Sequence, residues 1–358
     1  MKRVRIFAFG GNEVAPVGLT DEHGNPMVPD ISMQWQKTDR TAKRIAEIIK
    51  EYPDDYYIIT HGNGPQVGNI LLRAEYSRKY LPPLPLDVCG ADSQGAMGYM
   101  ISQILSNELR TFNIYKNVVS IVTQTVVDKD DPAFKNPTKF IGPPYSKDEA
   151  LERKKNEGWE VKFYKKNKLG QELWRKVVPS PKPVDIVEIE LIEHLLYTGA
   201  IPIAVGGGGI PVIHVDRDNN GVYKCNYNIS FKSNNEIPIY SGVEAVVDKD
   251  LASALLGRLL LNRARERSED IHISLTIFTN EDGAKLYYQT PQEKSLRKIT
   301  AAEAKKYYEE GHFPAGSMGP KIMAAAEFVE NGGDVAYITK TDLYLDTLNG
   351  KAGTTIVK

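Results

Sequence analysis

Short runs rich in β-branched and aromatic residues alternate with amphipathic helical stretches along most of the 358 residues of this chain. The first pair is typical: residues 4–9 predict a strand, and residues 35–51 place Ala42, Ile45 and Ile49 at helical spacing. Strands joined by helical crossovers pair in parallel, and helices then cover both faces of the sheet. The alternation therefore predicts an α/β fold with a central, mostly parallel sheet. Further strands are expected at 56–60, 118–123, 201–205, 244–247, 272–278, 335–339 and 354–357.

Residues 126–183 interrupt this alternation, because they are rich in Lys, Pro and Gly. The segment has proline-rich edges, with Pro132 near its start and Pro179, Pro181 and Pro183 at its end. Residues before proline favour extended connectors, so we expect a small protruding subdomain inserted between two strands. A long surface excursion is the alternative, although long loops are uncommon inside compact domains, which favours a lid. We thus expect one domain over residues 1–358, with this insertion.

Charge, cysteine content and hydrophobicity exclude several classes of protein. The chain has 45 Lys and Arg against 46 Asp and Glu, a formal net charge of -1, which gives no overall field for nucleic acid or an anionic membrane. It contains no uninterrupted apolar stretch of about 18 residues, and its amino terminus does not resemble a signal peptide. Cys89 and Cys225 stand far apart, so neither a disulfide framework nor a thiolate zinc site is indicated. We expect a soluble, cytoplasmic protein.

Glycine clusters follow three of the predicted strands, at 10–11, 62–64 and 206–209. At the carboxyl edge of a parallel sheet, glycine lets backbone N–H groups approach a ligand, and nearby helix N-termini favour anions. A single cluster of this kind is often only a tight turn. Three together indicate a phosphate site.

The common nucleotide and hydrolase motifs are absent from the sequence. There is no G-x-x-x-x-G-K-[ST], no H-E-x-x-H and no G-x-S-x-G. Residues 62–68 miss the G-x-G-x-x-G spacing by one position and contain Pro65. A P-loop and a dinucleotide fingerprint are therefore both rejected.

Three lysines have neighbours that set them apart from solvated surface charges. Lys129 and Lys249 are each flanked by aspartates, and Lys321 follows Gly319-Pro320. Lysines held by carboxylates beside strand ends suit a site that neutralises a phosphoryl group during its transfer.

Nine segments of the chain, spread from the first strand almost to the carboxyl terminus, stand out together. They are Gly10-Gly11-Asn12, residues 60–68, residues 87–91 with 93–95, residues 123–124 with 127–129, residues 131–139, residues 175–183, residues 206–212, residues 242–252 and residues 315–321. In sequence and in order, these segments resemble those of the carbamate kinases of the amino-acid-kinase superfamily.

The resemblance implies a three-layer αβα sandwich, a protruding subdomain near the site and a homodimer. It also implies reversible phosphoryl transfer between ATP and carbamate, which gives ADP and carbamoyl phosphate. By their place in the motifs, Gly10, Gly11 and Asn12 would hold the phosphoryl region, and Gly62, Asn63, Gly64, Gly208 and Gly209 would hold the carbamate side. Lys129 would reach in from the subdomain, Lys249 oriented by Asp250 would bridge the transferring group, and Lys321 would contact the nucleotide phosphates.

This chemistry needs no general base, because carbamate already carries an anionic oxygen. The requirements are alignment and screening of negative charge by lysines, glycine amides and Mg²⁺. Mg²⁺ would be bound mainly through ATP phosphates, so no metal site made of protein ligands is expected. His61 is expected to pack against its glycine turn, and His194, His214 and His272 to lie in helices or strands.

Three departures from the family pattern leave alternatives open. Glu13 stands where a small or apolar residue is usual, and it either faces the phosphoryl path or points outward. The connection over residues 16–31 is longer than usual, and residues 275–280 lack the family's Asp, which bears on nucleotide preference. A kinase for another small carboxylate-like or carbamate-like acid and a non-catalytic nucleotide-binding relative are the alternative functions.

Overall fold

The computed structural model describes residues 2–14, 16, 30–167, 169–314 and 316–358, without the side chain of Asn12. Most of the connection 16–31, predicted to be long, lies outside these residues. None of the helices within the described ranges is long and apolar enough to cross a membrane.

An eight-stranded sheet forms the centre of the molecule, in the order β17-β19-β18-β14-β1-β2-β9-β3. All neighbouring strands are parallel except β18 and β19. The predicted mostly parallel sheet is thus confirmed. The strands are β1 (Lys2–Phe9), β2 (Tyr56–His61), β3 (Val118–Ser120), β9 (Ile201–Ile203), β14 (Ile271–Phe278), β17 (Lys298–Thr300), β18 (Val335–Thr339) and β19 (Thr354–Val357).

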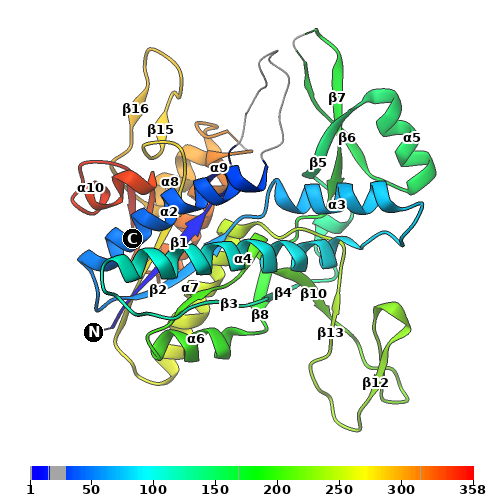
Figure 1. Cartoon of the computed structure of the whole chain (residues 1–358), viewed down its shortest axis with the longest axis horizontal. Coiled ribbons are helices and arrows are strands. Elements are labelled where there is room, and N and C mark those ends of the chain that lie inside the picture. The colour runs from blue at the N-terminus through cyan, green and yellow to red at the C-terminus, as the bar shows by residue number, and fades with distance from the viewer. Residues whose placement is uncertain (1, 15, 17–29, 168, 315) are drawn as a thin grey trace.

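Two helical layers cover this sheet, and alternate residues of β1 face each layer. Ile6 packs with residues of α6 (Ile189–Tyr197), α7 (Lys249–Glu266), α8 (Ala301–Glu309) and α9 (Met318–Glu330). Phe7 packs on the other side with residues of α2 (Ile31–Glu51), α4 (Leu86–Thr111) and α10 (Tyr344–Leu348). Burying one such side chain stabilises the fold by about 1.5–3 kcal/mol. The chain therefore forms the expected three-layer αβα sandwich (Figure 1).

Helix α2 begins four residues before the predicted start. Asp30 caps it by accepting a hydrogen bond from Met33 N at 2.7 Å. An Asp at this position satisfies an N–H group that the first helical turn leaves free, so the helix extends back to Ile31.

The prediction of a strand at residues 244–247 is wrong. These residues belong to no strand, and they lead into α7 through an irregular segment. Ala245 N donates to Val243 O at 2.9 Å, and Val246 N donates to Pro179 O at 3.0 Å. The apolar pattern reflects burial of these side chains, but no neighbouring strand in the described part of the chain pairs with their backbone N–H and C=O groups.

A second, four-stranded sheet lies beside the first, in the order β13-β10-β4-β8. Strand β4 follows directly after the segment 118–123, of which only Val118–Ser120 is a strand. The four strands are β4 (Gln124–Val127), β8 (Pro183–Ile186), β10 (Ile210–His214) and β13 (Tyr240–Gly242). Two antiparallel hairpins lie outside these sheets: β11 (Val222–Lys224) with β12 (Ser230–Lys232), and β15 (Lys285–Leu286) with β16 (Lys294–Ser295).

Within residues 126–183 the chain leaves these sheets and forms a separate three-stranded antiparallel sheet, β5-β7-β6. Its elements are β5 (Lys139–Ser146), α5 (Lys147–Glu157), β6 (Val161–Lys166) and β7 (Glu172–Val178). Buried Ala150, Trp159 and Val161 give it a small apolar cluster of its own. Figure 1 shows it beyond α3 (Gln66–Ser77), at one end of the molecule. We refer to residues 139–178 as the subdomain.

Candidate active site

The three glycine turns meet at one edge of the central sheet, because the strands that precede them, β1, β2 and β9, are neighbours. The backbones of the first two turns touch: a Cβ atom on Gly11 would lie 1.7 Å from Gly64 O. The third turn reaches the second, since a Cβ on Gly207 would lie 2.3 Å from Asn63 Nδ2. A side chain at Gly11 would push the first two turns apart, and one at Gly207 would displace the side chain of Asn63.

The third turn has an unusual backbone. Strand β9 ends at Ile203, two residues before the predicted end, and Val205 already adopts a left-handed conformation with φ of 51°. That conformation is strained for a β-branched residue and persists only when neighbours hold it. Val205 N donates to Thr123 Oγ1 at 3.0 Å, and Thr125 Oγ1 donates to Gly208 O at 2.8 Å. Two threonines therefore fix the turn that carries Gly208 and Gly209.

The amino end of α7 places a lysine over the second turn. A Cβ on Gly62 would lie 3.2 Å from Lys249 Cδ and 3.0 Å from Gly11 N. Asp248 caps the helix, because its Oδ1 accepts the backbone N–H of Asp250 at 2.9 Å. The cap fixes the first turn of α7, and with it Lys249 and Asp250.

Asp250 joins two of the predicted site lysines. Lys249 Nζ donates to Asp250 Oδ1, and Lys321 Nζ, from the first turns of α9, donates to Asp250 Oδ2 at 2.9 Å. The carboxylate is 3% exposed. The cluster of two ammonium groups and one carboxylate therefore holds a net positive charge beside the glycine turns, which suits an anionic ligand.

The pKa values within this cluster follow from burial and mutual charge. Burial would raise the pKa of Asp250, but the two ammonium groups outweigh it and hold that pKa far below its usual range. Burial lowers the pKa of Lys249; Asp250 opposes this effect, and Lys321 adds to it. Burial would also lower the pKa of Lys321, but the negative charges of Asp250, Asp248 and Glu13 outweigh it, so this pKa is raised. Lys321 thus stays protonated, while Lys249 is the more easily deprotonated of the two lysines.

A buried hydroxyl pair lies under Lys249. Ser253 Oγ donates to Lys249 O at 2.6 Å and shares a hydrogen bond of 2.6 Å with Thr60 Oγ1. This contact ties the first turn of α7 to the end of β2, so helix and glycine turn keep one relative position.

His61 has a packing role, as expected. Its ring contacts the third turn, since a Cβ on Gly206 would lie 2.6 Å from His61 Nε2. Burial lowers the pKa of His61 to about 4, and the positive charge of Lys249 contributes. The ring is therefore neutral near pH 7. His194, His214 and His272 lie in α6, β10 and β14, as expected.

The other predicted glycine-turn residues lie in the same place. Gly10 follows β1, and its carbonyl accepts from Glu13 N at 3.0 Å. Asn63 Nδ2 donates to Ser93 Oγ at 3.0 Å, and Ser93 Oγ donates to Gly90 O at 2.6 Å. Helix α4 thus holds the side chain of Asn63. The side chain of Asn12 lies outside the described part of the structure.

Lys129 lies apart from the Lys249 cluster. Its ammonium group pairs with Asp216, and both side chains are exposed. Strand β4 starts next to the third glycine turn, where Gln124 pairs with Ile210, and Lys129 follows its opposite end. In this structure Lys129 does not join the other candidate residues.

Glu13 points inward, so the outward alternative is wrong. It is 7% exposed, and Oε2 accepts from Thr341 Oγ1 at 3.4 Å. Its negative charge contributes to the raised pKa of Lys321. Residues 275–278 lie within β14, and Thr279 N donates to Thr339 O at 2.9 Å.

Sequence reasoning missed the residues that support the site. An Asp directly before an apolar helical run is an N-cap signal, and this signal at Asp248 could have predicted its capping role. Lys139 Nζ lies 3.1 Å from Asp248 Oδ2, and no local pattern predicts this contact across 109 positions. The pair Thr60 and Ser253 carries no local signal, because the two residues meet only in the fold.

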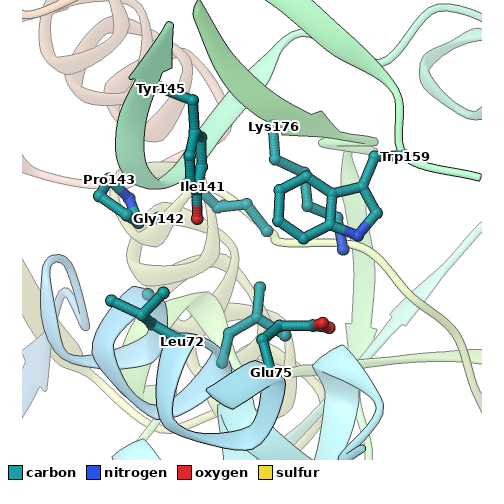
Figure 2. Close-up of a pocket in the computed structure, with 10 residues that line it drawn as sticks. Leu72, Glu75, Ile141, Gly142, Pro143, Tyr145, Trp159 and Lys176 are labelled. Atoms are coloured by element: carbon teal, nitrogen blue, oxygen red, sulfur yellow. The ribbon is translucent and has the colours of Figure 1, made fainter. Parts of the chain in front are cut away.

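A pocket lies away from this cluster, between α3 and the subdomain. Figure 2 shows Tyr145, Trp159 and Lys176 on the subdomain side, with Leu72 and Glu75 on α3. We place the candidate site at the glycine turns, because the buried charges gather there. Across the described ranges, no group of three or more His, Cys, Asp or Glu side chains is arranged to hold a metal ion.

The fold and the arrangement of these glycines and lysines are typical of a known class of enzymes. The model of the amino acid kinase family matches residues 9–340, and the chain belongs to that family. Within the family it belongs with the carbamate kinases. Those of Pyrococcus horikoshii and Pyrococcus furiosus are 44% and 43% identical to it, over 98% and 99% of this chain and the same shares of theirs. The solved structure of the carbamate kinase from Giardia lamblia bound to AMP-PNP is 36% identical, with a TM-score of 0.79 over 100% of this chain and 99% of that one.

Proposed function

We propose that this chain is a carbamate kinase, which transfers a phosphoryl group reversibly between ATP and carbamate to give ADP and carbamoyl phosphate. The observation that carries the proposal is the cluster of Lys249, Asp250 and Lys321 beside three touching glycine turns. Full-length similarity to carbamate kinases supports the same assignment.

The residues would act by positioning and by charge. Lys249, oriented by Asp250, would contact the transferring phosphoryl group, and Lys321 would contact the nucleotide phosphates. Gly10, Gly11 and Asn12 would hold the phosphoryl region, and Gly62, Asn63, Gly64, Gly208 and Gly209 the carbamate side. Fixed cations and amides in a buried site stabilise the spread charge of a phosphoryl transfer without reorganising.

Mg²⁺ would be bound through the nucleotide phosphates. The two nearest carboxylates already have other partners. Both oxygens of Asp250 accept from lysines, and Asp248 accepts from a helix N–H and from Lys139. When bound, the ion would neutralise phosphate charge. The resemblance also supports a homodimer in the cytoplasm.

Residues 126–183 would act as a lid, with Lys129 reaching the substrate on closure. The separate sheet of the subdomain supports a piece that moves as a unit. Lys129 lies outside the subdomain, in the connection between β4 and β5, so closure would also have to move this connection away from Asp216 and toward the glycine turns.

A coupled assay tests the function. Purified protein, ADP, Mg²⁺ and carbamoyl phosphate should yield ATP, and the variant Lys249→Met should yield little. Acetyl phosphate and other acyl phosphates are run in parallel, because a kinase for another acid would prefer one of them. Folded protein without turnover of carbamoyl phosphate would refute the proposal.

A further inference from the structure

Lys139, the first residue of β5, contacts the helix that carries Lys249. Its Nζ lies 3.1 Å from Asp248 Oδ2, and the two side chains are 38% and 20% exposed. The other oxygen of the same carboxylate, Oδ1, caps α7 by accepting from Asp250 N at 2.9 Å. A single carboxylate thus links the base of the subdomain to the first turn of α7.

A backbone contact lies beside this ion pair. Val178 is the register partner of Lys139 in the sheet of the subdomain. The next residue, Pro179, accepts through its carbonyl from Val246 N at 3.0 Å. The start of β5 and the end of β7 form the base of the subdomain. Both therefore hold the short segment 246–248 that enters α7.

The same segment touches the third glycine turn. A Cβ on Gly208 would lie 2.3 Å from Val247 O, and the φ of Gly208 is 93°. Residues 246–248 are thus packed between the subdomain and the glycine turns. A displacement of Lys139 and Pro179 would therefore shift both the first turn of α7 and the third glycine turn.

Farther from its base, the subdomain packs against α3, where Val67 and Leu71 form a buried apolar cluster with Ile141 and Val178. Gly68 and Gly142 approach closely, since a Cβ on Gly68 would lie 3.0 Å from Gly142 Cα. The register of β5 shifts between Ile141 and Tyr145, and the pocket of Figure 2 opens next to this point. The ion pair between Arg78 and Glu157 at the outer side is 4.0 Å long. These contacts hold the subdomain against α3, whereas the contacts of Lys139 and Pro179 at its base reach the segment that enters α7.

We propose that Lys139 is a positioning residue for phosphoryl transfer: through Asp248 it sets the first turn of α7, and so the placement of Lys249 and Asp250, when the subdomain is docked. This inference rests on the proposed function of those two residues. A small misplacement of a group that acts in the transition state lowers kcat more than it changes substrate binding.

The variants separate the effect of the charges of Lys139 and Asp248 from the effect of the helix cap that Asp248 provides. Lys139→Met removes the cation, and Lys139→Arg retains it. Asp248→Asn removes the negative charge but keeps a good N-cap, because Asn caps helices about as well as Asp. Lys154→Met is the matched control, since Lys154 pairs with Glu160 at 2.9 Å within the subdomain and is similarly exposed.

In the ATP-forming assay we expect Lys139→Met and Asp248→Asn each to lower kcat about tenfold, with the KM for ADP within about twofold of the parent value. The double variant should be no slower than Asp248→Asn alone, because Lys139 acts only through that carboxylate. Lys139→Arg should keep at least about half of kcat, and Lys154→Met should match the parent. A double variant whose losses multiply, or a Lys139→Met protein with the parent kcat, would overturn the inference.

Hydrogen exchange gives a readout that does not depend on turnover. Lys139→Met should speed amide exchange at residues 246 and 250–251 at least about threefold, while Lys154→Met should not. If the parent protein proved inactive on carbamoyl phosphate but showed this exchange pattern, the proposed function would fail and the contact itself would stand. Unchanged exchange in Lys139→Met would refute the positioning role.

Discussion

Lys321 and Asp250, 71 positions apart in the chain, form an ion pair with a distance of 2.9 Å between Nζ and Oδ2. Lys249 occupies the second oxygen of the same carboxylate. Since Asp250 neutralises only one of two buried ammonium groups, the cluster retains a positive charge at the end of the glycine turns. A phosphoryl group arriving there would supply the missing negative charge.

Lys249→Ala should lower kcat at least about 100-fold, the scale expected for one preorganised contact to the transition state. The measurement is the initial rate of ATP formation at saturating ADP and carbamoyl phosphate. Lys298→Ala, at an exposed lysine of β17, serves as the control and should keep the parent rate. Near-normal turnover by Lys249→Ala would remove this residue from the site.

Asp250→Asn should destabilise the protein by about 3 kcal/mol, because it leaves two buried ammonium groups facing each other with no carboxylate between them. Denaturant unfolding at pH 7 measures this loss. Lys298→Ala again gives the baseline. Equal stability of Asp250→Asn and the parent would mean that the carboxylate is not ionised in the folded state.

The Asp250 variant should also change the response to acid. The pKa of Asp250 in the folded protein lies below the ordinary value of 3.8, so its contribution to stability is complete above pH 3.8 and is lost as the pH falls below that value. The free energy of unfolding of the parent should therefore drop steeply below about pH 4, and that of Asp250→Asn less steeply. Parallel curves for the two proteins would contradict the depressed pKa.

His61 should affect stability at mildly acidic pH. Its pKa is lowered from 6.5 to about 4 in the fold, so the unfolded chain binds the proton more readily, and stability falls as the pH drops from 6.5 toward 4. A shift of this size corresponds to about 3 kcal/mol. We expect His61→Asn to flatten this part of the stability curve. An NMR titration showing a His61 pKa near 6.5 in the folded protein would contradict the expectation.

Gly11→Ala should abolish most activity, because its Cβ would lie 1.7 Å from Gly64 O and force the first two turns apart. Gly95→Ala is the control, since a Cβ there meets nothing within 4 Å and Gly95 lies in α4. We expect at least about a tenfold loss of kcat/KM in the first variant and none in the second. Full activity of Gly11→Ala would show that the turns can separate without harm.

Lys129→Met should act partly on KM. Lys129 pairs with Asp216 in this structure, so any role at the substrate requires movement of its segment. Loss of a contact that forms on closure weakens substrate binding as well as chemistry. Steady-state kinetics with varied carbamoyl phosphate measure the effect, and Asp216→Asn tests whether release from its present partner matters. Unchanged kcat and KM in Lys129→Met would exclude it from the site.

Regular elements of the core were predictable because their signals are local. The apolar runs at 335–339 and 354–357 became β18 and β19 with the predicted bounds. The equally apolar run 244–247 did not become a strand, since its backbone groups bond to Val243 and Pro179 instead of to a neighbouring strand. The start of α2 was misplaced because the cap at Asp30 lies before the first apolar residue at helical spacing.

Local patterns along the chain specify the alternation of strands and helices and the glycine turns after β1, β2 and β9. These depend on side-chain periodicity and backbone freedom, which act over a few residues. Other features arise only in the folded chain: Asp250 accepts from both Lys249 and Lys321, Glu13 is buried, and Lys129 pairs with Asp216. The choice of partner for a charge depends on which side chains the fold brings within about 4 Å of it. No pattern along the chain encodes that distance.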